Sequence, residues 1–178
     1  MIVYHVTIET SDDYLTRREA HRQAHIQRLT GLRAAGIVIA GGPAADGKSA
    51  ELFYRLQQPP QLKHVIEEDP YWLAKAWTRY TPRTFKGFVE PWEAPPIVLD
   101  GSRRATIVEG PTVDEDMAQF AMIEMRGAGR IQFGGFLEGG ATVALARTGD
   151  AAEALAWFRD SGFWDAAALA ARPFLYVL

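Results

Sequence analysis

Two halves of the chain carry the same order of local structural signals. Gly36–Gly42 (Gly-Ile-Val-Ile-Ala-Gly-Gly) aligns with Gly129–Gly135 (Gly-Arg-Ile-Gln-Phe-Gly-Gly) at an offset of 93 residues. Further along, Asp69-Pro70-Tyr71-Trp72 aligns with Ser161-Gly162-Phe163-Trp164 at an offset of 92 residues. A nearly constant offset across several elements is typical of an internal repeat. We therefore predict that the chain contains one structural unit in two copies.

A Pro-rich segment separates the two halves. Pro91, Pro95 and Pro96 fix the backbone φ angle and remove hydrogen-bond donors, which disfavours a helix or a central strand through this region. We therefore expect a first unit at residues 1–92, a linker at 93–102 and a second unit at 103–178.

Each half predicts the element order βαββαβ. Strands are indicated by β-branched and aromatic runs, and helices by cap-type residues before a helical apolar pattern. In the first half the strands are expected at 2–8, 37–40, 51–56 and 84–89, and the helices at 11–35 and from 61 through 77, with a break at Asp69-Pro70. In the second half the strands are expected at 105–108, 130–134, 142–146 and 174–177, and the helices at 113–128 and from 150.

One βαββαβ unit forms a four-stranded antiparallel sheet with both helices on one face, so its other face is bare. Two such units cover their bare faces by packing against each other. The predicted fold class is therefore α+β: two tandem ferredoxin-like βαββαβ units packed sheet to sheet as an intramolecular dimeric α/β barrel.

Composition excludes several classes of function. The chain has 19 Lys and Arg residues against 22 Asp and Glu residues, and its formal charge of -3 argues against nucleic-acid binding through bulk electrostatics. The absence of Cys excludes disulfides and Cys-ligated zinc. No signal peptide or membrane-spanning apolar run is recognisable, so we expect a soluble cytoplasmic protein without a membrane partner.

Three polar residues fall on the predicted buried face of the first helix. On a helical wheel that begins at Leu15, the residues Arg18, Arg22 and His25 lie within the apolar stripe that contains Leu29. Cations buried there need a cleft, a carboxylate partner or an anionic ligand. A single His in such a stripe is more often a hydrogen-bonded core residue, but three polar residues together favour a binding or catalytic site.

The second half acts as an internal control for this cluster. At the same offset the three positions are occupied by Pro111, Glu115 and Ala118. The scaffold is repeated while the polar cluster is lost, so we predict one functional site in the first half and a structural role for the second.

The same residues carry a family resemblance. Arg22-Gln23-Ala24-His25-Ile26, Gly36–Pro43 and Glu68-Asp69-Pro70-Tyr71 resemble the helix, strand-turn and Asp-Pro-Tyr motifs of the YCII family. The second half resembles that family only as a degenerate copy. The resemblance implies a ferredoxin-like fold, a His–Asp pair at His25 and Asp69, and activity of the lyase type, with HCl eliminated from a chlorinated hydroxyquinol.

The chemistry of these residues fits such a reaction. An imidazole with a near-neutral pKa accepts a proton from a phenol or an activated carbon, and a carboxylate on its second nitrogen fixes the tautomer. We therefore expect His25 and Asp69 as catalytic residues and Arg22, Arg18 and Tyr71 as substrate-binding residues. No cofactor and no metal are predicted. The expected partner is a small-molecule substrate, and two chains are compatible with a homodimer.

Several alternatives stay open at this point. Asp69 suits a helix N-cap before Pro70 equally well. His21 and His25 have a metal-compatible i, i+4 spacing, but no acidic ligand is obvious nearby. His5 is expected to make a structural hydrogen bond, and His64 is expected at the surface. Trp72 and Trp77, with Tyr71, suit either an aromatic pocket or the core.

Two further functions compete with a cofactor-free lyase or isomerase. The first is a non-catalytic protein that binds a small anion through Arg18, Arg22 and His25. The second is another branch of dimeric α/β barrels, similar to muconolactone isomerases or antibiotic monooxygenases, although their motifs are missing. The enzyme hypothesis requires His25 and Asp69 to lie within hydrogen-bond distance of each other and to line a pocket; it fails if their side chains lie well apart or if His25 is sealed in the core without a cavity.

Overall fold

The computed structural model describes residues 1–44 and 46–178 and divides the chain into two compact units. Unit 1 comprises Met1–Thr84, Pro95–Leu99 and Tyr176–Leu178, and unit 2 comprises Phe85–Ala94 and Asp100–Leu175. Residues 90–103 form neither helix nor strand, as the prolines in this segment predict.

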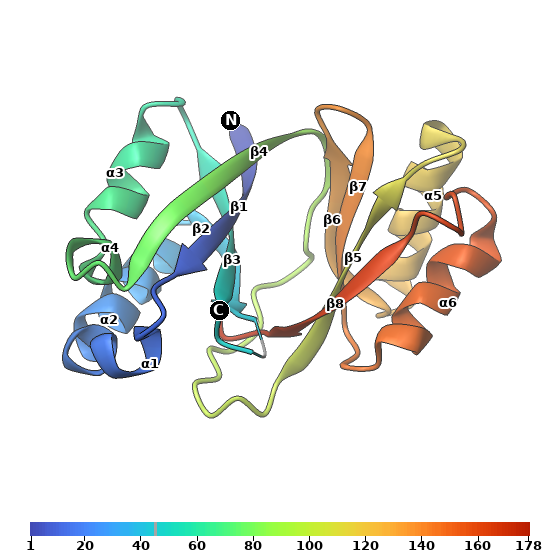
Figure 1. Ribbon diagram of the computed structural model, residues 1–178. Coiled ribbons are helices and arrows are strands. Elements are labelled where there is room, and N and C mark those ends of the chain that lie inside the picture. Colours follow the sequence, from blue (N-terminus) through green and yellow to red (C-terminus); the bar gives the residue numbers. More distant parts are fainter. Residues whose placement is uncertain (45) are drawn as a thin grey trace. The chain divides into compact units, whose positions relative to one another are not determined.

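Unit 1 has the predicted βαββαβ order, with its helical parts subdivided. Its elements are β1 (Ile2–Thr10), α1 (Tyr14–Arg17), the 3₁₀ helix η1 (Glu19–His21), α2 (Arg22–Ala34), β2 (Val38–Pro43), β3 (Ser49–Leu56), α3 (Gln61–Glu67), α4 (Pro70–Leu73) and β4 (Trp77–Val89). The strands pair antiparallel in the order β2-β3-β1-β4, and β1 pairs with the Trp77–Thr84 part of β4. The helices of this unit all cover one face of its sheet (Figure 1).

Unit 2 repeats this order. Its elements are β5 (Arg104–Pro111), α5 (Glu115–Gly127), β6 (Ile131–Leu137), β7 (Ala141–Ala146), α6 (Ala151–Ser161) and β8 (Ala170–Leu175). The strand order β6-β7-β5-β8 corresponds to that of unit 1, and the Phe85–Val89 part of β4 pairs with β6. Both helices lie on one face of the sheet (Figure 1). The two units therefore share one topology, which is the ferredoxin-like arrangement expected for a βαββαβ sequence.

The side chains of β1 alternate between the two faces of the sheet. Tyr4, Val6 and Ile8 are buried in the apolar core between the unit 1 sheet and its helices. His5 points to the opposite face, where it is fully buried and hydrogen-bonded to Glu51. The prediction of a structural hydrogen bond for His5 is therefore confirmed.

The first helical segment differs from the sequence prediction because it is not one continuous helix. The 3₁₀ helix η1 interrupts it between α1 and α2, and a 3₁₀ turn advances the chain by a different rotation per residue. A helical wheel that begins at Leu15 therefore assigns the wrong residues to the buried face. Leu15 is 61% exposed, and Tyr14 is buried instead. The prediction that Arg22 lies in the buried stripe is wrong, since Arg22 is exposed at the start of α2.

The second helical segment of unit 1 ends earlier than predicted. It was expected to continue through Trp77, but α4 ends at Leu73 and Trp77 is the first residue of β4. The strand predicted at 84–89 therefore starts at Trp77, and the strand predicted at 174–177 is β8, from Ala170 to Leu175. The strand predicted at 37–40 is β2, which continues through Pro43, and residue 45 lies outside the described residues.

Candidate functional site

The structure brings His25 and Asp69 into direct contact. The imidazole Nδ1 of His25, on α2, lies 2.8 Å from Oδ1 of Asp69, the residue that precedes α4. The Asp69 side chain is fully buried, and the His25 side chain is 10% exposed. Two residues 44 positions apart in the sequence thus form one buried pair between two helices.

The Asp-Pro sequence explains how the carboxylate reaches this position. Asp69 has extended backbone angles, as the steric effect of Pro70 requires, and it is the N-cap of α4. Its Oδ1 also accepts a hydrogen bond of 2.8 Å from the backbone N–H of Tyr71. The two roles considered for Asp69, helix cap and histidine partner, are therefore carried by the same oxygen, while Oδ2 is buried without a partner in the described chain.

Aromatic rings fix the plane of the His25 ring. Tyr71 stacks on it with a centroid distance of 3.8 Å and an interplanar angle of 11°. Trp77 meets it edge-on at 5.2 Å, with an interplanar angle of 86°. Because Asp69, Tyr71 and Trp77 all come from the short stretch around α4, this one segment both binds and orients the imidazole.

The hydrogen bonds determine which nitrogen of His25 is available. Oδ1 of Asp69 already acts as an acceptor for the Tyr71 N–H, and an ionised carboxylate only accepts, so Nδ1 of His25 must donate. The lone pair is then on Nε2, which has no hydrogen-bond partner in the described part of the chain. This arrangement leaves Nε2 as a Brønsted base.

His5 has the opposite arrangement and provides a useful contrast. Its Nε2 binds the Glu51 carboxylate, and its Nδ1 receives a hydrogen bond of 2.8 Å from Nη2 of Arg83. Because a guanidinium only donates, Nδ1 is the acceptor and Nε2 carries the proton. Both ring nitrogens of His5 are engaged, so of these two buried histidines only His25 has a nitrogen available for chemistry.

The two other predicted substrate-binding residues, Arg18 and Arg22, differ in exposure: Arg18 is half-buried and Arg22 is exposed. The Arg18 guanidinium is centred 5.2 Å from the centroid of the Tyr14 ring. Burial raises the pKa of the Tyr71 hydroxyl, and the positive charges of Arg18 and Arg22 act in the opposite direction. Arg22 is exposed and makes no hydrogen bond or ion pair in the described chain, so it is available to a ligand but is not part of the buried pair.

Two buried tyrosines near this site were missed by the sequence analysis. Tyr14 is edge-on to Tyr71 at 5.9 Å, and burial raises the pKa of its hydroxyl. Tyr54, on β3, is fully buried; burial and the charge of Asp69 both raise the pKa of its hydroxyl, which has no partner in the described chain. The alternation of Leu52, Tyr54 and Leu56 along β3 is the signal that places Tyr54 on the helix-facing side.

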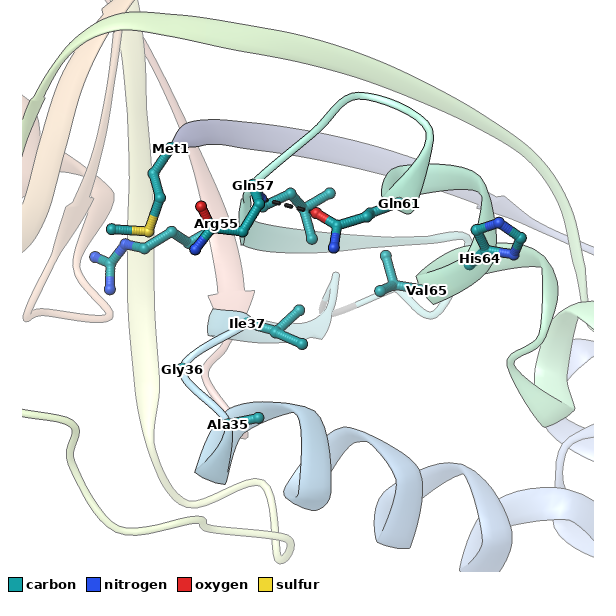
Figure 2. Close-up of a pocket in the computed structure, with 10 residues that line it drawn as sticks. Met1, Ala35, Gly36, Ile37, Arg55, Gln57, Gln61, His64 and Val65 are labelled. Carbon is teal, nitrogen blue, oxygen red and sulfur yellow. Dashed lines mark hydrogen bonds between the residues drawn. The ribbon is translucent and has the colours of Figure 1, made fainter.

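One cavity lies away from the His25–Asp69 pair. It has a volume of about 510 Å³ and is bordered by the end of α2, the start of β2, the end of β3 and α3 (Figure 2). The hydrogen bond from the Gln57 backbone N–H to the Gln61 side chain is seen there. Neither His25 nor Asp69 lines it, and its lining residue Ala35, the C-cap of α2, is ten positions beyond His25, roughly 15 Å along a helix axis, so this cavity does not give access to His25.

A second cleft adjoins the aromatic residues of the site. Its volume is about 480 Å³, and it is lined by Trp72, Leu73, Lys75, Trp77 and Thr78. Trp77 therefore contacts both this cleft and the His25 ring. The sequence analysis left open whether Trp72 and Trp77 line a pocket or fill the core; they line this cleft, and Trp77 is also part of the core.

The remaining histidines have simpler surroundings. His21 is exposed, and within the described residues no group of three His, Cys, Asp or Glu side chains is placed to hold a metal ion. The His64 side chain is 71% exposed, as expected, and bonds to Glu68. Among the described helices none has the length and apolar character needed to cross a membrane.

Comparisons with known proteins identify relatives only at the level of the fold. No protein-family model matches the chain, and no curated protein sequence matches it. A candidate monooxygenase from Lactobacillus acidophilus aligns over 98% of this chain and 93% of its own, with 10% identity and a TM-score of 0.62. A mutant chlorite dismutase from Candidatus Nitrospira defluvii aligns over 99% and 90%, with 10% identity and a TM-score of 0.53.

A third similar structure covers one half of the chain. It is a 5-chloro-2-hydroxyhydroquinone dehydrochlorinase from Burkholderia phenoliruptrix in complex with 2,5-dihydroxybenzoquinone. It aligns over 45% of this chain and 89% of its own, with 18% identity and a TM-score of 0.41. From the full-length alignments, the chain has a mixed α+β fold with neighbours of the dimeric α/β-barrel type.

Proposed function

We propose that this protein is a YCII-like, cofactor-independent lyase or isomerase in which His25 transfers a proton to and from a small aromatic or carbonyl compound. In this proposal the first unit carries the site, and the second is a degenerate duplicate with a structural role. The single observation that supports it best is the oriented imidazole: Nδ1 is bound to the buried Asp69 carboxylate and Nε2 has no partner in the described chain.

The proposed step uses His25 as the base and Asp69 as its positioning residue. Nε2 removes a proton from a phenolic hydroxyl or an activated carbon, and the Asp69 carboxylate stabilises the resulting imidazolium. With a chlorinated hydroxyquinol, return of the first proton to the chlorine-bearing carbon gives a keto tautomer, and removal of a second hydroxyl proton then expels chloride. The products are a hydroxyquinone and HCl, so atoms and charge balance without an oxidant. Arg18 and Arg22 are proposed to attract the phenolate or carboxylate of the substrate.

A panel assay tests this proposal. Chlorinated hydroxyquinols are assayed for chloride release, and small enolisable ketones for exchange of the α-proton in D₂O. We expect turnover by the native protein and a loss of about 10²–10⁴-fold in His25→Ala, which is the range for removal of a general base. The matched control is His64→Ala, because His64 is exposed and lies outside the site. Equal turnover by the native protein and His25→Ala would exclude His25 from the mechanism.

A second candidate function is binding of a small anion without chemistry. It is favoured by the exposed Arg22, which has no ion-pair partner in the described chain, beside the partly exposed Arg18. This function predicts a ligand affinity that depends on Arg22 and Arg18 and no turnover of any compound in the panel.

A further inference from the structure

The backbone at Lys75 has an unusual conformation. Lys75 has a φ angle of 58°, and it is the only residue other than glycine with a positive φ among the described residues. It follows the C-cap of α4, where its N–H bonds to the Trp72 carbonyl and the next N–H, of Ala76, bonds to the Tyr71 carbonyl. This pair of hydrogen bonds is the Schellman motif, whose left-handed position is usually occupied by glycine.

The same chain provides the comparison. At the end of α2 the same two hydrogen bonds are made by Gly36 and Ile37, and at the end of α5 by Gly129 and Arg130. Gly36 and Gly129 have φ angles of 72° and 73°. In a left-handed conformation a Cβ atom is strained against the backbone, and glycine avoids this strain. The end of α4 therefore keeps a lysine side chain at a position where the local fold favours glycine.

The lysine is placed beside an aromatic cleft. Lys75 lines the cleft of about 480 Å³ together with Trp72, Leu73, Trp77 and Thr78. It is exposed and has no ion-pair partner in the described chain. Strained residues are often found where the side chain has a function. From the strain and the cleft together, we infer that this cleft binds a small aromatic anion, with Lys75 as the counter-ion.

The cleft residues define this class of ligand. The half-buried Trp72 and the exposed Leu73 provide apolar surface for an aromatic ring, the buried Trp77 borders the cleft, and the Lys75 ammonium supplies a positive charge beside them. Arg17 donates to the carbonyl of Ala74 next to Lys75, but its charge is balanced by an ion pair with Asp13. The volume lies within the range of small-molecule pockets and suits a ligand of one or two rings. The inference concerns binding and does not depend on proton transfer at His25.

Calorimetric titration of the whole protein tests whether this cleft binds an aromatic anion. It uses a matched pair of probes, 2-naphthoate and its neutral isostere 2-naphthamide. We expect naphthoate to bind the native protein about threefold more tightly, the preference typical of one exposed ion pair. Lys75→Gln and Lys75→Gly should remove this preference, whereas Lys63→Gln, which removes an exposed lysine on α3, should keep it.

The two Lys75 variants differ in a second, independent measurement. Lys75→Gly relieves the left-handed strain, so its Tm should rise by about 2 °C while the preference for naphthoate is lost. Lys75→Gln loses the preference without this rise. Equal binding of the two probes by the native protein, no binding of either, or an unchanged preference in Lys75→Gln would overturn the inference. Binding of the two probes is measured without turnover, so a failure of the proposed proton transfer in the panel assay is distinguishable from a failure of this binding site.

Discussion

Two replacements of Asp69 measure its contributions as the N-cap of α4 and as the hydrogen-bond acceptor for His25. Oδ1 accepts hydrogen bonds from the Tyr71 N–H and from Nδ1 of His25, each at 2.8 Å. Asp69→Ala removes both acceptors. Loss of the N-cap costs about 1 kcal/mol, and the buried His25 N–H left without a partner costs about 1–3 kcal/mol. The total destabilisation is therefore about 2–4 kcal/mol.

Asp69→Asn should be much less harmful to stability. Asn is as good an N-cap as Asp, and the substitution removes a buried charge whose Oδ2 has no partner in the described chain. We expect a loss of at most about 1 kcal/mol. At about 2–4 °C per kcal/mol for a chain of this length, the Tm should fall by about 8 °C in Asp69→Ala and by at most about 3 °C in Asp69→Asn.

Thermal and urea unfolding followed by circular dichroism measures these differences. Asp114→Ala is the matched control: Asp114 caps α5 by accepting from the Met117 N–H, so only the cap, worth about 1 kcal/mol, is lost. Activity should show the opposite pattern, since Asp69→Asn should lose about 10²–10⁴-fold of turnover while keeping its fold. A stability loss in Asp69→Asn as large as in Asp69→Ala would refute this reasoning, because it would attribute stability to the buried charge.

Two further predictions concern positions away from the site. The side-chain hydrogen bond from Arg17 lowers the pKa of Asp13 from 3.8 to about 2, so this pair stabilises the fold above pH 3.8 and loses that effect as the pH falls through 2. Carboxyl NMR titration should show this pKa return toward 3.8 in Arg17→Gln, and an unchanged value would contradict the assignment. Gly135→Ala should destabilise by about 3 kcal/mol, because its Cβ would collide with the backbone oxygen of Gly87. Gly31→Ala, with open space on α2, should stabilise by about 0.5–1 kcal/mol in the same unfolding assay, and similar effects of the two substitutions would refute the steric argument.

The topology was predictable because each element carries its own local signal. The alternation in β1 identifies its two faces, and Asp114 and Asp150 cap α5 and α6 at the predicted starts. The common strand order of the two units follows from the βαββαβ sequence itself.

The interruption of the first helix was not predictable from periodicity. A wheel assumes one rotation per residue, and η1 breaks that assumption between Arg18 and Arg22. The buried position of His25 was predicted because it lies four residues from Leu29 within α2 itself. Arg22 was misjudged and Tyr14 was overlooked because the phase was set from Leu15, on the other side of the break.

The early end of α4 escaped the sequence analysis for a related reason. A glycine usually marks a Schellman motif, but here Lys75 takes the left-handed position, so the helix was extended to Trp77. The contact of His25 with Asp69 was anticipated from the family resemblance, whereas Tyr54 was missed although the alternation along β3 places it on the helix-facing side.

The tautomer of His25 is the most direct test of the central claim, since it requires no substrate. Long-range ¹H–¹⁵N NMR of the histidine side chains near neutral pH distinguishes a protonated ring nitrogen from an unprotonated one. We predict the Nδ1–H tautomer for His25, with Nε2 unprotonated, and the Nε2–H tautomer for His5 in the same spectrum. An Nε2–H tautomer for His25 would contradict the account, because the nitrogen proposed as the base would already carry the proton.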